Sequence, residues 1–397
     1  MIRRVAALVL GGALFAAWGC GARTGLDEAD LGGGAGGSGA SGSSGAGSGS
    51  GSGGSGSGSS GSGSGGLMPG CAGGVVTLYT GPALPSGGAQ GPGALAVDSA
   101  AVYWTAPPTT EALGGAVMSV PSCGGAASTL ASPDASTSQV NLGALAVAGS
   151  NVYWATQGDT SPSPDGQVMR VPAAGGASSV VVKDQLPVAL TADATHLYWT
   201  DDHSGAVWRA PLAGGVPSQL GVGLGFGGVE VGSIAVDASS VYFYSTQQGI
   251  QSVPLSGGPT TSPTQLLQID SAHGDSLYGL AASGGRIYWS DGLLQNGTVQ
   301  SLPTGGGAPT TLVSASPTDV VGDIAVDGVS VYWIGAHCTS ALASSCTGKL
   351  TRVPAAGGPP TVVASGWPSG DALGVLAVDA TSVYFTAGNT ILKATPK

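Results

Sequence analysis

The chain has 397 residues, of which 73 are Gly and only 8% are charged, and its formal net charge is −11. Residues 67–397 carry that whole charge, with eight basic and nineteen acidic side chains. Nucleic acids are bound by Lys and Arg side chains that neutralise phosphates, so this composition argues against a nucleic-acid partner.

Residues 1–20 have the pattern of an export signal. Arg3 and Arg4 precede fourteen uncharged residues, 5–18, that are rich in Ala, Leu and Val. This run is shorter than the roughly 20 residues that cross a bilayer, and it fits the core of a signal peptide. The sequence Ala-Trp-Gly-Cys at 17–20 resembles a bacterial lipobox, in which the Cys is acylated and becomes the mature N-terminus. We therefore predict a lipoprotein signal peptide with lipidation at Cys20; an ordinary secretory signal is the alternative.

Residues 21–66 are predicted to be a disordered linker. From 32 to 66 the chain contains only Gly, Ser and Ala, which cannot bury enough apolar surface to offset chain entropy. A flexible segment of this length has a root-mean-square span of roughly 30–35 Å. The lipid on Cys20 would anchor the chain in a membrane, and Gly21 does not resemble an inner-membrane retention signal. We therefore expect a cell-envelope protein in the outer membrane, on its periplasmic or surface face.

Seven copies of one phrase determine the fold expected for residues 67–397. In each copy an apolar run, a short turn and an apolar residue precede Tyr with Trp or Phe, as in LAVDSAAVYW at 95–104. Each copy predicts two strands joined by a hairpin. The tyrosines are 44 to 52 residues apart, close to the 40–50 residues of a propeller blade. They are Tyr103, Tyr153, Tyr198, Tyr242, Tyr288, Tyr332 and Tyr384.

Five copies have an Asp five residues before the Tyr. Asp favours turns because its carboxylate bonds nearby backbone N–H groups, so we interpret these residues as turn formers rather than as a repeated ligand site. They are Asp98, Asp193, Asp237, Asp327 and Asp379.

A second phrase completes the repeat. In six copies an apolar residue and Pro precede a Gly pair, which predicts a third strand, a tight turn and a fourth strand. Four strands make one propeller blade. The seventh copy ends after a third strand at 390–395, whereas residues 75–78 read as a fourth strand that no blade precedes. We therefore predict an all-β, seven-bladed β-propeller over 67–397, closed by the N-terminal strand.

The repeats also carry a family signature. Residues 198–201 read YWTD, and residues 288–291 read YWSD. The chain resembles YWTD and NHL-type propellers over about residues 75–397. This resemblance implies binding of a protein or glycan more often than catalysis, as an analogy of fold.

Four cysteines remain for the folded part. Cys338 and Cys346 flank a loop in the sixth repeat, which predicts a local disulfide in an exported protein. Cys71 and Cys123 each lie beside a Gly pair in neighbouring repeats. A disulfide between these two stays open, because bridged Cα atoms lie within about 7 Å.

Most of the acids are expected on one face of the propeller. Connections from second to third strands, and those between blades, share this face, and thirteen of the nineteen acids of 67–397 fall in them, with Asp323 close behind. Loops collect polar residues whatever their role, but such a face could also attract a divalent cation or a basic partner. The candidate ligand-binding residues are Asp201, Asp202, His203, Asp270, His273, Asp275, Asp291, Asp319 and Asp371.

The leading functional hypothesis is a surface-tethered, non-enzymatic propeller that binds a protein or glycan through this acidic face. No pattern of nucleophile and base is present, and no catalytic residue or cofactor is predicted. One alternative is a metal-assisted lactonase, lyase or hydrolase, with acids and His203 or His273 around a divalent cation at the central opening. The other is a structural factor in envelope assembly.

Overall fold

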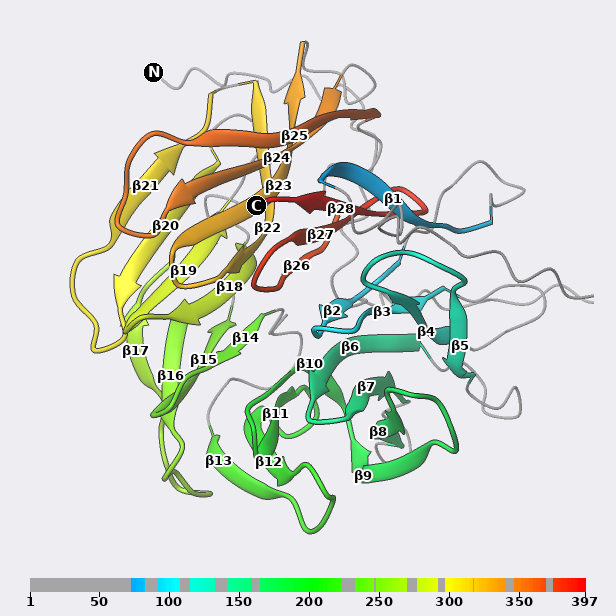
Figure 1. The fold of residues 1–397 in the computed structure, drawn as a ribbon. Helices are drawn as coiled ribbons and strands as arrows, with labels where there is room; N and C mark the ends of the chain where they lie inside the picture. Colours follow the sequence, from blue (N-terminus) through cyan, green and yellow to red (C-terminus); the bar gives the residue numbers. More distant parts are fainter. Residues whose placement is uncertain are drawn as a thin grey trace, which may run out of the picture. The chain divides into compact units, whose positions relative to one another are not determined.

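The computed structural model describes residues 73–82, 92–107, 115–132, 141–158, 165–222, 233–245, 248–269, 277–291, 297–316, 318–339, 346–368 and 374–397. These residues form seven four-stranded antiparallel sheets around a common axis (Figure 1). The predicted seven-bladed propeller is therefore confirmed. The predicted signal peptide and linker, with Cys20, lie outside this part of the chain. No helix among the described residues is long and apolar enough to cross a membrane.

Each blade has four strands, and the first strand named for each blade lies nearest the axis. Blade 1 has β2 (Leu95–Val97), β3 (Ala101–Ala106), β4 (Ala116–Pro121) and β5 (Ser128–Ala131). Blade 2 has β6 (Asn141–Ala148), β7 (Asn151–Gln157), β8 (Gly166–Pro172) and β9 (Ser179–Gln185). Blade 3 has β10 (Pro187–Ala192), β11 (His196–Asp201), β12 (Ala206–Pro211) and β13 (Ser218–Val222). Blade 4 has β14 (Ile234–Val236), β15 (Ser240–Ser245), β16 (Gly249–Pro254) and β17 (Thr264–Leu267).

The remaining three blades follow the same plan. Blade 5 has β18 (Leu277–Ser283), β19 (Arg286–Asp291), β20 (Thr298–Pro303) and β21 (Thr310–Ser314). Blade 6 has β22 (Asp319–Val326), β23 (Ser330–Cys338), β24 (Cys346–Pro354) and β25 (Thr361–Pro368). Blade 7 has β26 (Leu376–Val378), β27 (Val383–Ala387), β28 (Thr390–Thr395) and, as its outer strand, β1 (Gly74–Thr80).

The ring closes by pairing the two ends of the propeller. Strand β1 runs antiparallel to β28, with Val75 opposite Ala394 and Thr77 opposite Leu392. The predicted closing strand at 75–78 is thus confirmed, and it extends by a residue or two at each end. Because the outer strand of blade 7 comes from the other end of the chain, the ring has no open seam.

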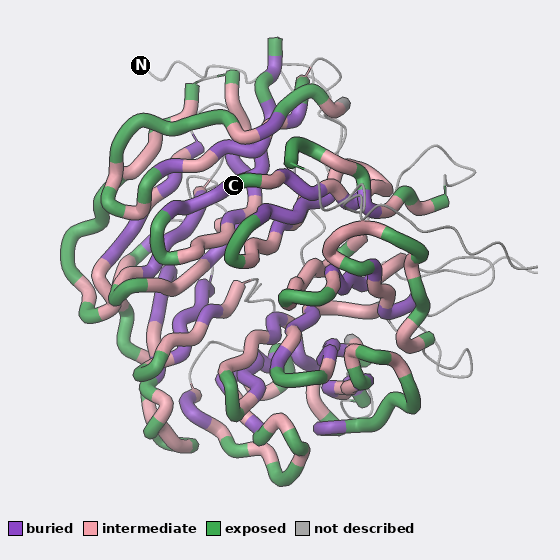
Figure 2. Tube along the Cα trace, in the orientation of Figure 1, coloured by how far each residue is buried: buried purple, intermediate pink, exposed green. Residues whose placement is uncertain are grey.

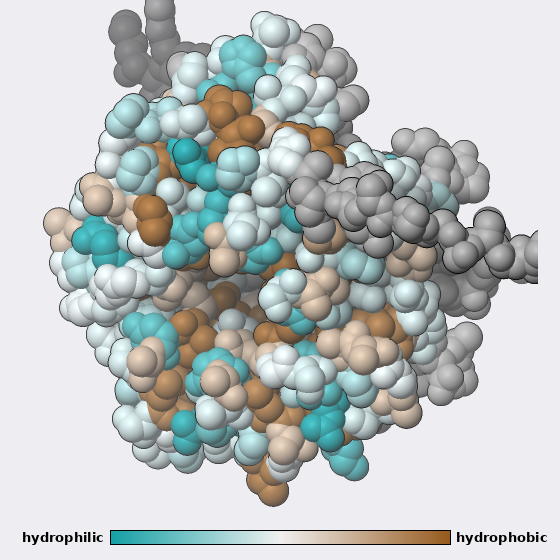
Figure 3. Space-filling view, in the orientation of Figure 1, coloured by the Kyte–Doolittle hydropathy of each residue, from teal (hydrophilic) through white to brown (hydrophobic). Residues whose placement is uncertain are grey.

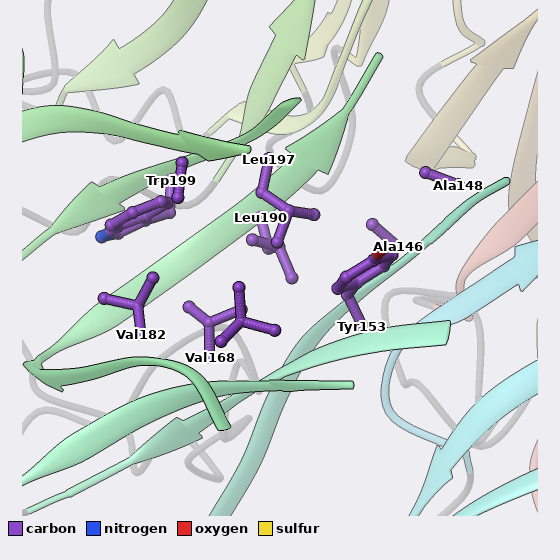
Figure 4. Close-up of a cluster of buried hydrophobic side chains, with 10 residues drawn as sticks. Ala146, Ala148, Tyr153, Val168, Val182, Leu190, Leu197 and Trp199 are labelled. Carbon is purple, nitrogen blue, oxygen red and sulfur yellow. The ribbon is translucent and has the colours of Figure 1, made fainter. Parts of the chain in front are cut away.

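The hydrophobic core lies between the blades. Successive side chains of a strand point to opposite faces, so the Tyr and the Trp of each repeat reach different neighbouring blades. Tyr153 of blade 2 packs with Leu190, Leu197 and Trp199 of blade 3 (Figure 4). Trp154, the next residue, packs instead with the cluster that contains Tyr103 of blade 1. Buried segments accordingly run along the strands, while exposed ones gather at the outer turns (Figure 2).

The repeated Asp residues are turn formers, as predicted. Asp193 Oδ1 accepts hydrogen bonds from the backbone N–H groups of Thr195 (2.6 Å) and His196 (2.8 Å), and Oδ2 accepts one from the Tyr198 hydroxyl (2.7 Å). The same carboxylate-to-Tyr bond recurs at Asp98, Asp237, Asp327 and Asp379. These five acids therefore hold the first hairpin of their blades and the repeat Tyr that follows.

Basic residues on third strands connect neighbouring blades. Arg209 of blade 3 donates to the Leu255 carbonyl of blade 4 (2.7 Å), and Arg170 of blade 2 donates to the Leu212 carbonyl of blade 3 (3.1 Å). Lys393 of blade 7 donates to the Ser122 carbonyl of blade 1 (2.9 Å), across the closure. These three cations thus hold neighbouring blades together.

Three cysteines lie among the described residues. A disulfide joins Cys338 to Cys346, which face each other at the ends of β23 and β24. Cys123 is also disulfide-bonded. Cys71, its proposed partner, lies outside the described residues.

Candidate functional site

The predicted cluster at 201–203 divides into one structural residue and two exposed ones. Asp201 is buried at the end of β11, where Oδ1 accepts bonds from the Ser204 amide (2.7 Å) and hydroxyl (2.6 Å) and Oδ2 from the Leu186 amide (2.6 Å). Asp202 and His203 are exposed in the following turn. Protein around Asp202 raises the pKa of its carboxyl, and the neighbouring Asp201 charge raises it further. Only Asp202 and His203 of this cluster are thus presented to solvent.

Asp291 joins the two middle strands of blade 5, β19 and β20. Its Oδ1 accepts hydrogen bonds from the Thr298 amide (3.1 Å) and hydroxyl (2.5 Å), and its Oδ2 accepts one from Gln300 Nε2 (2.7 Å). The sequence placed Asp291 in a loop, whereas the structure places it as the last residue of β19, paired with the first residue of β20. Its carboxylate is therefore engaged by the blade itself.

Asp319 is the centre of a charged group in blade 6. The carboxylate lies 2.8 Å from His337 Nδ1 and 2.5 Å from Lys349 Nζ. Burial alone would raise the pKa of Asp319, but the bonds from Lys349 and His337 outweigh it, and the pKa is lowered. The three side chains come from β22, β23 and β24, so this ion pair joins three adjacent strands of one blade.

The described members of the predicted acidic face do not converge on one point. Within the described part of the chain, no group of three or more His, Cys, Asp or Glu side chains is placed to hold a metal ion. Asp270, His273, Asp275 and Asp371 lie outside the described residues.

A cavity on the propeller axis is the strongest candidate site. Its volume is about 290 Å³, and residues of all seven innermost strands or the residues just before them line it. The wall includes the Leu or Ile that opens each repeat phrase: Leu95, Leu145, Leu190, Ile234, Leu280, Ile324 and Leu376. In the space-filling view a hollow lies at the middle of the ring, with hydrophobic residues around it (Figure 3).

Among the described residues that line this cavity, Asp323 is the one with an ionisable side chain. It precedes Ile324, and the same position in the other blades is occupied by uncharged residues: Ala94, Ala144, Ala189, Ser233, Gly279 and Val375. The repeat phrase carries this signal, because alignment of the seven copies makes Asp323 the sole acid at its position. Sequence reasoning grouped it with the loop acids and missed its place on the axis.

Two neighbouring blades hold the Asp323 carboxylate. Oδ1 accepts a bond from the Ile324 amide (2.9 Å), and Oδ2 accepts one from the Leu376 amide of blade 7 (3.1 Å). From blade 5, Gly279 approaches so closely that an added Cβ would lie 2.7 Å from Oδ1. Burial raises the pKa of Asp323 to about 7, against the opposing effect of the two amide bonds. The carboxylate is thus fixed in position and can exchange its proton near neutral pH.

A larger cavity of about 600 Å³ lies between blades 6 and 7, on the face that carries the repeated Asp turns. Its charged side chains already have partners within the protein. Lys397 Nζ lies 2.6 Å from Asp327 Oδ2, and Arg352 donates to the Lys397 carbonyl (2.5 Å). Because Lys397 already bonds to Asp327 and Arg352, these charged groups are not available to a ligand. We therefore regard the axial cavity as the better candidate site.

The two faces of the ring differ in regularity. On the face that carries the repeated Asp turns, first hairpins have two to four residues, and outer turns have six residues in five blades and nine in blade 4. On the opposite face, which we call the loop face, second-to-third-strand connections range from two residues (388–389) to nine (107–115). Connections between blades range there from one residue (186) to fourteen (81–94).

Blade 6 contributes the largest departure from the repeat. Strands β23 and β24 have nine residues each, and they carry the Cys338–Cys346 disulfide at their loop-face ends. The Asp319, His337 and Lys349 side chains lie along this extension. The loop face is therefore varied in both length and chemistry, whereas the opposite face is nearly uniform.

Comparisons with known proteins give the fold and no family. No protein-family model matches the sequence, and no curated protein sequence matches it. The structure of YCF48 bound to a D1 peptide is 10% identical, with a TM-score of 0.54 over 81% of this chain and 96% of that chain. A chain of the mitotic checkpoint complex is 12% identical, with a TM-score of 0.54 over 81% of this chain and 94% of that chain. The nidogen/laminin complex is 16% identical, covering 56% and 83%, with a TM-score of 0.41.

Proposed function

We propose that this protein is an exported binding propeller, anchored to the cell envelope by lipid on Cys20, that binds a protein or glycan ligand through its loop face. The observation that carries the proposal is the unequal regularity of the two faces. In repeat proteins, insertions that differ from repeat to repeat map to one face, and that face is often the binding face.

The chemistry of the loop face supports a polar ligand. Asp202 and His203 are exposed in the turn of blade 3, and the His337 imidazole is about half exposed on the extension of blade 6. The carboxylates of Asp201 and Asp291 accept hydrogen bonds from groups of their own blades. We therefore assign recognition to the exposed side chains around them. The same fold occurs in YCF48 bound to a D1 peptide, which is an analogy of fold alone.

The N-terminal sequence supplies the anchor in this proposal. Lipid on Cys20 would hold the chain at the membrane, because each buried CH₂ of an acyl chain adds about 0.8 kcal/mol of membrane affinity. The Gly/Ser/Ala segment would keep the propeller clear of the surface so that its loop face can meet a partner. Mass spectrometry of the mature protein should find an acylated N-terminal Cys20. An N-terminus at another residue would contradict the anchor and leave the binding proposal standing.

The binding proposal is tested with two matched variants of blade 3. Asp202→Arg places a cation on the loop face, and Val216→Arg places one on the opposite face, where Val216 is 91% exposed. The full-length protein and both variants are screened against an array of bacterial glycans and a library of peptides from envelope proteins. We expect ligands of the wild type to bind Asp202→Arg at least tenfold more weakly and to bind Val216→Arg unchanged. Loss with Val216→Arg alone, equal loss with both variants, or no ligand at all would contradict the proposal.

A further inference from the structure

The axial cavity contains a carboxyl group that no cation of the described residues accompanies. Asp323 accepts two backbone hydrogen bonds, and among the described residues no Lys, Arg or His forms an ion pair with it. The other cavity-lining side chains are apolar except for the hydroxyl of Ser233, from blade 4. A carboxylate among apolar groups is costly unless hydrogen-bond donors and a cation accompany it, and here the two backbone donors are present without a cation. The blades nevertheless hold this carboxylate rigidly, at a position where six other blades have uncharged residues.

The size and lining of the cavity limit what could accompany Asp323. A volume of about 290 Å³ is near the lower end for small-molecule sites and far above the roughly 30 Å³ that one water occupies in the liquid. Calcium takes six to eight oxygen ligands, whereas this lining offers two oxygen-bearing side chains. The surrounding Leu and Ile side chains suit an apolar body. The chemistry therefore fits a small organic cation better than a metal ion.

We propose that the axial cavity binds a small organic ammonium compound, whose charged nitrogen pairs with the Asp323 carboxylate and whose apolar body lies against the Leu and Ile ring. This site is separate from the loop-face contact proposed above, so either can fail alone. A fixed carboxylate gives such a ligand its orientation without an ordering cost at the moment of binding. The innermost strands begin at the loop face, and Asp323 lies five residues into β22.

The binding should depend on pH, because the ligand needs the ionised carboxylate. Ionisable groups also lie on the elements packed against β22. Tyr278 lies on β18, and Arg286, Tyr288 and Asp291 lie on β19. Asp319 lies on β22 and Asp327 directly after it, and they are paired with Lys349 and Lys397; Tyr332 and His337 lie on β23. Strand β26 carries no ionisable residue. Of these groups, only His337 is an exposed imidazole, so the variant His337→Gln serves as its control.

The experiment is a calorimetric titration of the full-length protein with cyclohexylamine and with cyclohexanol, which has a similar shape and no charge. An alkylamine has a pKa near that of a Lys side chain, about 10.4, and stays protonated at both pH 6 and pH 8. Asp323→Ala is expected to fold, because Ala stands at the same position in blades 1, 2 and 3. Asp323→Asn keeps the shape of the side chain and is the second variant. Asp202→Ala removes an equal charge from the loop face.

We expect cyclohexylamine to bind at pH 8 and to bind about tenfold more weakly at pH 6, the ratio that a pKa of about 7 gives for the ionised fraction. Cyclohexanol should bind at least tenfold more weakly than the amine. Both Asp323 variants should lose at least tenfold in affinity, while Asp202→Ala and His337→Gln bind as the wild type does. Equal affinity for amine and alcohol, or full affinity in both Asp323 variants, would overturn the proposal. So would the absence of binding by cyclohexylamine, benzylamine and n-butylamine alike.

Discussion

Replacing Asp323 by Ala should change the pH dependence of stability in a direction fixed by the structure. Burial raises the pKa of this carboxyl to about 7, so the folded protein holds the proton more tightly than the unfolded chain does. The contribution of Asp323 to the free energy of unfolding is therefore fully present below about pH 4, and it is lost as the pH rises through 7. Because Ala has no proton to lose, the variant should gain stability relative to the wild type as the pH rises.

The size of this gain follows from the two pKa values. A rise from about 3.9 in the unfolded chain to about 7 is worth about 4 kcal/mol in all, at about 1.36 kcal/mol per unit. About 2–3 kcal/mol of this falls between pH 5 and pH 8. Water reaches the carboxylate through the cavity, so we expect about 2 kcal/mol. Asp323→Ala also loses the bonds to the Ile324 and Leu376 amides. This loss lowers the free energy of unfolding of the variant at both pH 5 and pH 8, so it largely cancels in the difference between them.

The assay is urea unfolding of the wild type and Asp323→Ala at pH 5, 6, 7 and 8, without added ligand. Ser233→Ala is the matched control, because it alters the same ring position in blade 4 without removing an ionisable group. Its effect on the free energy of unfolding should be the same at every pH. A difference between Asp323→Ala and the wild type that stays constant from pH 5 to pH 8 would refute the reasoning, since Asp323 would then titrate alike in both states.

Three further predictions concern the repeat. Tyr198→Phe removes the hydroxyl bond to Asp193 and should lower the free energy of unfolding, measured by urea titration, by about 1–2 kcal/mol. Tyr288→Phe is the control, because its repeat has Ser at the Asp position, and it should lower this free energy by under about 0.5 kcal/mol. Hydrogen bonds hold the pKa of Asp193 at about 2, although burial opposes them, so its stabilising effect should disappear between about pH 4 and pH 2. Circular dichroism during acid titration should show a shallower loss for Asp193→Asn than for the wild type. Arg209→Met keeps the aliphatic stem but loses the bond to blade 4, and limited proteolysis should cut the variant faster. Equal cutting rates would show that this bond contributes little to holding the blades together.

The architecture was predictable because the seven repeats encode it locally. The spacing of the Tyr residues gives the blade number, and alternation in each phrase gives strands with one face toward each neighbour. The unpaired strand at 75–78 and the incomplete seventh repeat give the closure that the structure has in β1 and β28. The role of the five Asp residues was also local, since each carboxylate accepts bonds from the backbone amides two and three residues after it and from the Tyr of its own phrase.

The environment of single polar side chains could not be predicted in this way. Asp201 looked like a loop acid next to Asp202, but the fold buries it because the Leu186 amide, fifteen residues earlier, arrives at its carboxylate. The repeat places Arg209 on a third strand, but nothing local indicates that its partner is a carbonyl of the next blade.

By itself the sequence determined the number of blades, their strands and the closing strand, since these depend on short-range alternation and on a repeat that the chain states seven times. Only the tertiary structure decided which acids face solvent, which accept hydrogen bonds from their own blades and which single carboxylate reaches the axis. Gly279 and Leu376, which bury and bond the Asp323 carboxyl, lie about one blade away along the chain in each direction. Burial and the desolvation of a charge depend on groups that only the closed ring brings together.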